Sequence, residues 1–334
     1  MATFAELGRQ QAIAQLFEGT GFQPFGEPLY FEAAPGECVT TATATLLEGV
    51  DFDLVYFPLK HLGYKAVIAA TGELYAVMAH PRTLSITLGV SAKLDYEQVR
   101  ELWSGVVSAA KEHGYKSLSL MLQPSRNGLS VGVAATGACS KLTCVRRSKA
   151  HTKDLICVTG SLGAAYLGMQ LLEREKVRFD NGATTPQDME RYKMLVGAYL
   201  KPELGAGVVS QFEDIQVIPS YGYFITRGLS DALLRLTRDS GLGAKVYADK
   251  IPFEGNSFSL GKDINVDPVS AAMNGGDDFK LLFTVPILEL EKVRREFQTF
   301  DIIGHLAQSE VGTVLVTPEG VELTVSAQGW NNNQ

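Results

Sequence analysis

Strand-like and helix-like segments alternate along this chain of 334 residues, which restricts the fold to a mixed α/β architecture. Residues 40–45 and 83–90 are rich in β-branched side chains and predict strands. Residues 96–113 place apolar side chains on one helical face, and Gly114 then ends the predicted helix. A further helix is predicted at 64–78, opening after Gly63, and two strands at 118–122 and 129–136 flank the turn PSRNG.

The second half continues the alternation. Residues 155–159 predict a short buried strand, which leads through a glycine turn into the helical sequence AAYLGMQLLERE. We expect the polar stretch 180–192 to form a loop. Further strands are predicted at 215–225 and 278–285, helices at 229–240 and 288–297, and a hairpin from 312–318 and 321–325. Length and pattern together predict two domains, residues 1–140 and 141–330.

Composition and charge exclude several classes of protein. The chain is 46% hydrophobic and 20% charged, as expected for a globular core, and no run of about 18 apolar residues predicts a membrane span. The net charge is −7, and the basic run at 141–153 is too short for a nucleic-acid-binding stripe. The start, MATFAELGRQQAIAQLFEG, predicts an amphipathic helix rather than a signal peptide, so we expect a cytoplasmic protein without nucleic-acid or membrane partners.

The cysteines form no metal-binding or disulfide pattern. They are Cys38, Cys139, Cys144 and Cys157, without a CxxC pair or a nearby histidine. Buried thiols are therefore expected rather than disulfides or a zinc site. The five histidines are scattered, which argues against a histidine-based metal site.

Six ordered segments carry a resemblance to the thiamine-monophosphate kinase family. They read LLEGVDFD at 46–53, PLKHLGYKA at 58–66, RRSKAHTKDLICVTGSLGAAYLG at 146–168, GLSDALLRLTRDSGLGAKVYADKIP at 228–252, NGGDDFKLLFTVP at 274–286, and the terminal GW at 329–330. The resemblance covers nearly the whole chain. It implies membership of the wider aminoimidazole-ribonucleotide (AIR) synthetase-like superfamily.

This resemblance implies a two-domain α/β (α+β) fold. The N-terminal domain would carry a mixed sheet with helices that forms a homodimer and the nucleotide side, and the C-terminal domain would be an α/β layer with the active site in the cleft between them. The family transfers the γ-phosphoryl group of ATP to thiamine phosphate. Its cofactors are Mg²⁺ and ATP, and Mg²⁺ requires hard oxygen ligands, which the family supplies from clustered aspartates.

Several of those aspartates are missing here. By the resemblance, Ala44 replaces the aspartate of a TTDLL-like strand, and Met121 lies where the phosphate-cradling GGDTT belongs. Phe224 and Arg227 replace two aspartates of a D-I-S-D-G segment. An alkyl, thioether or aromatic group is a poor ligand for Mg²⁺, and a guanidinium repels it. We therefore expect an impaired or inactive kinase homologue, a pseudoenzyme, in which binding of Mg²⁺ and ATP is weakened.

Two carboxylates survive as weak metal candidates. Glu27 remains from a GDDAAV-like loop, in which Pro28 replaces the second acid, and Glu73 remains from an N-x-S-D element. Together with Asp231 they define the alternative of an active kinase with a divergent metal site. A third alternative is a different ligand-binding or partner protein on the same fold.

The substrate side is better preserved by the same resemblance. Asp277 matches the acidic residue of GGEDYEL and suits a cationic heterocycle, and Trp330 matches a terminal aromatic residue that would stack on a ring. Asp51 replaces a histidine of EGVHFD, and Arg147 matches an arginine that contacts ATP. Each has a plain structural alternative: a loop for Asp277, core capping for Trp330 and a solvated surface for Arg147. The turn Gly160–Gly163 likewise either accepts an anion or only starts a helix.

Overall fold

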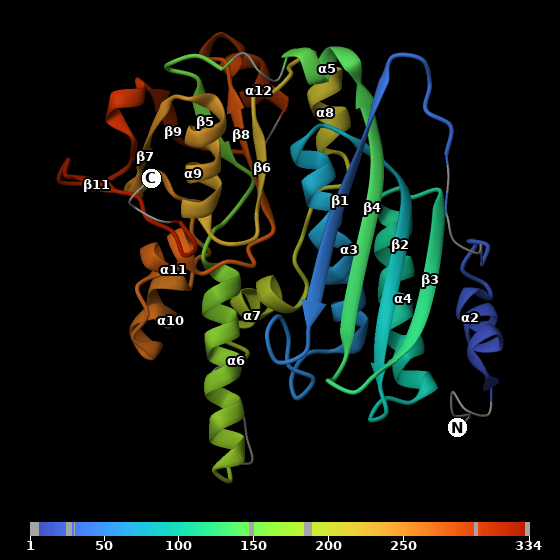
Figure 1. Cartoon of the computed structure of the whole chain (residues 1–334). Helices are drawn as coiled ribbons and strands as arrows, with labels where there is room; N and C mark the ends of the chain where they lie inside the picture. The colour runs from blue at the N-terminus through green and yellow to red at the C-terminus, as the bar shows by residue number, and fades with distance from the viewer. Residues whose placement is uncertain are drawn as a thin grey trace. The chain divides into compact units, whose positions relative to one another are not determined.

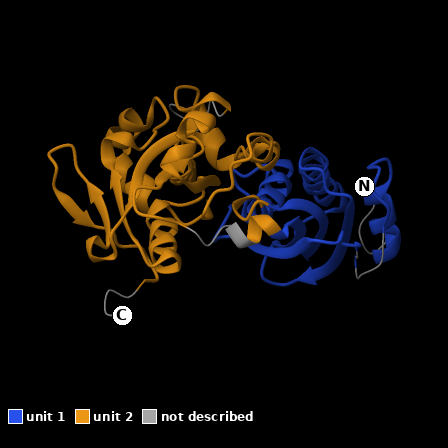
Figure 2. Cartoon of the chain, turned by 90° about the horizontal axis from the view of Figure 1, so that it is seen from above, with its two compact units in different colours: residues 1–74, 79–141 blue, residues 75–78, 142–334 orange. Residues whose placement is uncertain are grey.

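The computed structural model describes residues 7–24, 29, 31–146, 150–183, 189–296 and 300–330. The chain divides into two compact units, shown in different colours in Figure 2. Unit 1 comprises residues 1–74 and 79–141, and unit 2 comprises residues 75–78 and 142–334. Glu27 and Arg147, predicted to contact metal and nucleotide, lie outside the described residues.

Unit 1 is a four-stranded sheet with helices. Its elements, apart from the last two residues of α3, are α2 (Arg9–Phe17), β1 (Glu37–Leu47), α3 (Leu59–Ala76), β2 (His80–Ser91), α4 (Tyr96–Glu112), β3 (Ser117–Ser125) and β4 (Ser130–Ser140). The strand order is β1-β4-β2-β3. Strand β4 is antiparallel to both neighbours, whereas β2 and β3 are parallel and are joined through α4. A helix in that connection is the usual way to link two parallel neighbours.

One face of this sheet is covered by α3 and α4 (Figure 1). Leu84, Ile86 and Leu88 of β2 are fully buried on that face, opposite residues of β4 that are buried as well. The alternate residues of edge strand β1, Thr41 and Thr43 among them, are exposed. This period of two gives the sheet one apolar face and one hydroxyl-rich face.

The helices α3 and α4 cross at two glycines. A Cβ atom on Gly63 would collide with the carbonyl oxygen of Leu102, and one on Gly105 would collide with that of Lys60. The prediction that a helix opens after Gly63 is therefore wrong: α3 begins at Leu59, and Gly63 serves close helix packing instead of a helix start. The start of α4 is capped reciprocally, because Asp95 accepts from the Gln98 amide and Gln98 accepts from the Asp95 amide.

Unit 2 is a seven-stranded sheet with helices on it. Its elements are α5 (Lys141–Arg146, whose first residue belongs to unit 1), β5 (Leu155–Val158), α6 (Ala164–Asp180), α7 (Lys193–Leu200), α8 (Val208–Asp214), β6 (Gly222–Ile225), α9 (Leu229–Ser240), β7 (Gly243–Tyr247), α10 (Ser257–Ile264), α11 (Pro268–Asn274), β8 (Lys280–Val285), α12 (Leu290–Glu296), β9 (Asp301–Ala307), β10 (Thr313–Val316) and β11 (Glu322–Thr324). The strand order is β11-β10-β7-β9-β5-β8-β6, and only the β10–β7 pair among these is parallel.

The sheet of unit 2 has apolar side chains on both faces. One cluster joins the sheet to α9 through residues such as Ile156, Val246 and Leu233. On β8, Phe283 meets Phe212 of α8 edge-on, with ring centroids 4.9 Å apart. Strands β5, β6 and β8 therefore read as nearly continuous apolar runs, as strands buried on both faces do.

The predicted α/β fold class is confirmed by these two sheets and their helices. The predicted strand at 215–225 is wrong over its first seven residues. Only Gly222–Ile225 is strand (β6), because the left-handed φ of 56° at Gln216 interrupts extended backbone and Pro219 has no amide to donate to a neighbouring strand. The loop predicted at 180–192 was placed one residue too early, since α6 still includes Asp180.

The cysteines agree in part with their predicted burial. Cys139 and Cys157 are buried and Cys38 is half-buried, but the prediction is wrong for Cys144, which is exposed on α5. Within the described ranges, every helix is too short or too polar to cross a membrane.

Candidate functional site

The turn Gly276–Phe279 in unit 2 has strained backbone. Asp277 has a φ of 60° and Phe279 a φ of 51°, in the left-handed region that bulky side chains avoid. Two bonds to the end of β6 hold it there: Asp277 donates to the carbonyl of Thr226 at 2.9 Å, and Phe279 donates to that of Ile225 at 3.0 Å. Such strain persists only where the surroundings impose it, and it is concentrated at functional sites.

This turn brings two predicted site segments together. A Cβ atom on Gly276 would lie 2.9 Å from the Thr226 oxygen and 3.5 Å from the Cα atom of Arg227, so glycine permits the approach. Asp277 is half-buried, while Arg227 is exposed at the end of the neighbouring segment. Asp277, predicted to contact the substrate, and Arg227, predicted by the resemblance to replace a metal-binding aspartate, thus lie on adjacent backbone segments.

Phe224 is a core residue. Its side chain is 1% exposed on β6, and its ring meets that of Phe279 edge-on at 5.5 Å between centroids and 65° between planes. An aromatic pair in this geometry is worth about 0.5–1.5 kcal/mol beyond the area it buries. The position where the resemblance expects a metal ligand is filled by packed hydrocarbon.

Asp278 occupies the N-terminus of α6. One carboxylate oxygen accepts from the Gly163 amide at 2.8 Å, and the other lies 3.4 Å from the Ala165 amide. Burial of this carboxyl raises its pKa to about 7, although the hydrogen bonds from the two amides lower the pKa. The amide that ends the turn Gly160–Gly163 thus donates to a carboxyl group of the chain itself.

Lys280 lies beside this cap. Its Nζ donates to the Glu203 carbonyl at 3.2 Å, and its stem lies 3.5 Å from where a Cβ of Gly160 would be. Burial lowers the pKa of this ammonium, while the charges of Asp278, Glu203 and Glu254 raise it.

Trp330 is held on α9. Its indole Nε1 donates to Oδ1 of Asp231 at 2.9 Å, and the Arg238 guanidinium lies 5.4 Å from the ring centroid. Arg235 approaches the other oxygen of Asp231 at 4.0 Å. One aromatic residue predicted for substrate and one carboxylate considered for metal are therefore bound to each other.

The candidate residues of unit 1 lie apart along its elements. The Oδ2 atom of Asp51 accepts from the Leu47 amide at 2.7 Å, which closes the loop after β1. Glu73 is half-buried on α3. Ala44 lies on β1 opposite Val133, and Met121 lies within β3 opposite Thr87, in regular strand rather than in a phosphate loop.

Two buried polar residues were missed by the sequence reasoning. Lys65 of α3 is 1% exposed, with its Nζ 5.2 Å from the Phe57 ring centroid, and Asp278 is 4% exposed. A lysine inside the apolar run of 62–70 was the available signal for the first. Nothing local distinguishes Asp278 from Asp277.

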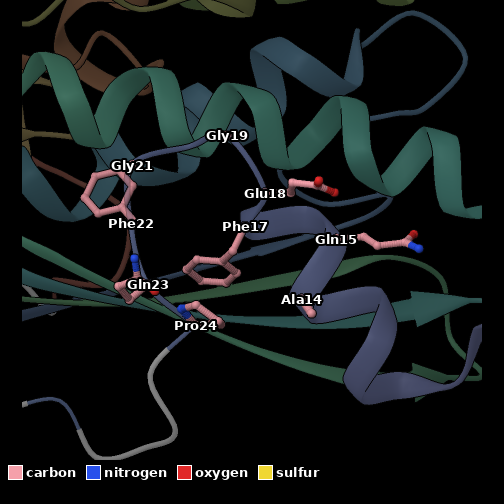
Figure 3. Close-up of a pocket in the computed structure, with 9 residues that line it drawn as sticks. All are labelled: Ala14, Gln15, Phe17, Glu18, Gly19, Gly21, Phe22, Gln23 and Pro24. Carbon is pink, nitrogen blue, oxygen red and sulfur yellow. The ribbon is translucent and has the colours of Figure 1, made fainter.

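Among the residues that the structure describes, no group of three or more His, Cys, Asp or Glu side chains has the arrangement to hold a metal ion. A hollow of about 460 Å³ lies between the end of α2 and the chain up to Pro24, with Phe17 and Phe22 among its lining residues (Figure 3). It contains none of the residues predicted for substrate, nucleotide or metal.

Comparison with known proteins yields one consistent result. Residues 28–139 match the family described as AIR synthase related protein, N-terminal domain. The thiamine-monophosphate kinase of Pyrococcus horikoshii is 28% identical over 251 residues, which cover 74% of this chain and 72% of that protein. That of Bacillus subtilis is 21% identical over 292 residues, 86% of each chain.

Solved structures share the fold. A thiamine-monophosphate kinase of Stenotrophomonas maltophilia has a TM-score of 0.74 at 21% identity, covering 95% of this chain and 96% of that one. The E. coli hydrogenase maturation protein HypE has a TM-score of 0.72 at 16% identity, covering 97% and 98%. The solved structures thus show a shared fold, and the family model identifies an AIR synthase-related N-terminal domain at residues 28–139. The curated relatives named above are both thiamine-monophosphate kinases, and the chain is similar to that family over most of its length.

Proposed function

We propose that this protein is a thiamine-monophosphate kinase-like protein that has lost most or all phosphoryl transfer and retains a site for thiamine phosphates. The observation that carries the proposal is the packing of Phe224 against Phe279 where the family resemblance expects a metal-binding aspartate. Phosphoryl transfer depends on charge neutralisation by Mg²⁺ and on positioning, and hydrocarbon at that position contributes to neither.

The neighbouring groups support the same conclusion. Arg227 adds a positive charge beside the strained turn, where it opposes a metal ion. Asp231, which a divergent metal site would need, already accepts a hydrogen bond from Trp330. Its other oxygen lies 4.0 Å from Arg235, whose positive charge opposes a metal ion there.

Asp277 supports retained binding. Its carboxylate is half-buried on strained backbone, a setting suited to a cationic ring. One solved structural neighbour is described as complexed with AMPPCP and TMP; it is 21% identical, has a TM-score of 0.71 and covers 97% of this chain. We propose the thiamine-bearing ligand for this chain and little affinity for ATP with Mg²⁺.

Calorimetric titration tests this. Purified protein is titrated with thiamine phosphate and, separately, with ATP and Mg²⁺, and product formation is followed in a mixture of all three. Heat is expected with thiamine phosphate alone, and diphosphate production is expected to be negligible. Turnover at roughly 1–100 s⁻¹, the usual range of kinases, overturns the loss of activity. If neither thiamine phosphate nor ATP with Mg²⁺ binds, the proposed thiamine phosphate site is wrong, and a different ligand on the same fold is favoured.

A variant locates the binding. Asp277→Asn preserves the left-handed backbone, which asparagine tolerates, and removes the charge. Thiamine phosphate affinity is expected to fall about 10-fold, equal to about 1.4 kcal/mol. The matched control is Asp214→Asn, an exposed acid at the end of α8, which should leave the affinity unchanged. Equal effects in both variants would place the ligand elsewhere.

We further propose that two copies form a homodimer through the N-terminal part, residues 1–140, which also carries the nucleotide side. The exposed face and edge of β1, with Val39 54% and Leu47 43% exposed, support this. Light scattering that gives the mass of a monomer would contradict it. We place the protein in the cytoplasm, where buried thiols such as Cys157 stay reduced.

A further inference from the structure

Two cysteines face each other across the β1–β4 pair. Cys38 and Cys139 are direct partners in the antiparallel register, near the start of β1 and the end of β4. Directly opposite residues point to the same face of a sheet, so the two side chains are neighbours. Both are thiols in the structure; Cys38 is half-buried and Cys139 is 6% exposed.

The backbone bonding defines the spacing of this pair. The Lys141 amide donates to the Gly36 carbonyl at 2.8 Å, and the Glu48 amide donates to the Leu129 carbonyl at 3.1 Å. Hydrogen-bonded pairs recur at every second residue, so Cys38 and Cys139 also form such a pair. Their Cα atoms are then about 5.5 Å apart, inside the range of about 4.4–6.8 Å that disulfides span.

We propose that Cys38 and Cys139 are a reversible disulfide site, oxidised by a low-molecular-weight disulfide such as oxidised glutathione. Neither the kinase-family activity nor the proposed ligand site enters this inference. The other two cysteines lie elsewhere: Cys144 is on α5, and Cys157 is fully buried on β5 of unit 2.

The reaction is thiol–disulfide exchange in two steps. The Cys38 thiolate, the more exposed of the pair, attacks one sulfur of the small disulfide, which breaks its S–S bond, releases one thiolate and leaves a mixed disulfide on Cys38. The Cys139 thiolate then attacks the Cys38 sulfur and releases the second thiolate. The two protons lost by the cysteines pass to the two released thiolates. Two cysteines are oxidised, and one small disulfide is reduced to two thiols.

The bond would join the edge strand β1 to β4 immediately before β4 continues into α5. It closes a loop of about 100 residues, a length for which cross-linking stabilises strongly by restricting the unfolded chain. The Cβ atoms of a hydrogen-bonded pair are about 5.5 Å apart, whereas a disulfide needs about 3.5–4.5 Å. The two strands must therefore move closer together when the disulfide forms, which strains the bond. We expect reductants to break a strained disulfide readily.

The test uses the full chain in a series of oxidised and reduced glutathione ratios, followed by acid quenching, alkylation and peptide mapping without reduction. The expected product is a Cys38–Cys139 cross-linked peptide that disappears with dithiothreitol. The oxidised protein should melt about 5 °C or more above the reduced protein. Cys144→Ser should form the same product, and Cys38→Ser and Cys139→Ala should not.

Three outcomes would overturn the proposal. They are persistence of both thiols while Cys144 becomes glutathionylated, a stable mixed disulfide on Cys38 without a cross-link, and a cross-link that requires Cys144. Peptide mapping of the protein with its native sequence distinguishes these outcomes even if a cysteine variant fails to fold.

Discussion

Phe224 and Phe279 meet edge to face inside unit 2, with ring centroids 5.5 Å apart and ring planes at 65°. They join the end of β6 to the strained turn that carries Asp277. Placing at position 224 the acid that the family resemblance predicts therefore has a structural cost, because a carboxylate would replace buried hydrocarbon.

Phe224→Asp is expected to lower the free energy of unfolding by at least about 3 kcal/mol, since truncation of a buried phenylalanine alone costs about that much. Urea denaturation measures the change. The control Phe224→Leu should cost about 1–2 kcal/mol, because it keeps most of the apolar volume. An Asp variant as stable as the native protein, with new affinity for Mg²⁺, would show that the position is an open metal site.

Gly63→Ala and Gly105→Ala are each expected to lower the melting temperature by several degrees, because the added methyl group meets a backbone carbonyl of the opposing helix. The matched control is Gly197→Ala on α7, where nothing lies within 4 Å of the new Cβ atom. That change should be neutral or stabilise by about 0.5–1 kcal/mol through helix propensity. Equal melting temperatures in all three variants would contradict the close α3–α4 crossing.

Trp330→Phe is expected to loosen the C-terminal segment, because it removes the N–H that donates to Asp231. The bond should be worth about 1 kcal/mol. Faster amide hydrogen exchange at residues 325–330 is the measurement. Asp231→Ala should have the same effect, and the double variant should add little, which a double-mutant cycle reports as coupling. Fully additive effects would indicate that the two residues act independently.

Asp278 is expected to make stability depend on pH. Burial raises the pKa of its carboxyl to about 7, above the value near 4 of the unfolded chain, so the folded state binds more protons between those values. Stability should therefore fall as pH rises from about 4 to about 7, by up to about 1.4 kcal/mol per pH unit. Urea midpoints across this range should lose that slope in Asp278→Asn.

Two histidines, the buried His113 and the half-buried His305, oppose this trend and are the same in both proteins. Burial lowers the pKa values of His113 and His305, so their contribution falls as pH decreases below about 6.5. The difference between native protein and Asp278→Asn isolates the carboxyl. An unchanged slope would mean that Asp278 is already ionised at acidic pH.

Local signals predicted α4 and α9 well, whereas the short helices α7, α8, α10 and α11 were not predicted. The predicted bounds of α9 match the structure because Gly241 ends it in the left-handed conformation, and α4 follows its apolar spacing and its Asp95 cap. The errors arise where tertiary contacts decide. Glycine often precedes a helix, so the sequence predicted a helix start after Gly63. The reason for this glycine is the close approach of α4, which the local sequence does not contain.

The candidate site was predicted by resemblance and remains partly a prediction. The sequence named Asp277 and Trp330, but it could not indicate that Trp330 would bind Asp231, 99 residues away, or that Asp278 would cap a helix 115 residues before it. Such contacts depend on how segments distant in the sequence pack against each other. A short stretch of sequence carries no information about that packing. The roles of Asp51 and Glu73 in ligand and metal binding stay predictions.

The carboxylate on the first turn of α6 has one more consequence. A phosphate group that binds the Gly163 and Ala165 amides must compete with the Asp278 carboxylate, which is covalently part of the same chain. Short tethers of this kind produce effective concentrations of at least about millimolar. Acidification that protonates Asp278 weakens this competitor. At this helix end, where a phosphate can bind in other proteins, the acceptor is a side chain of the chain itself, and its charge follows the pH of the solution.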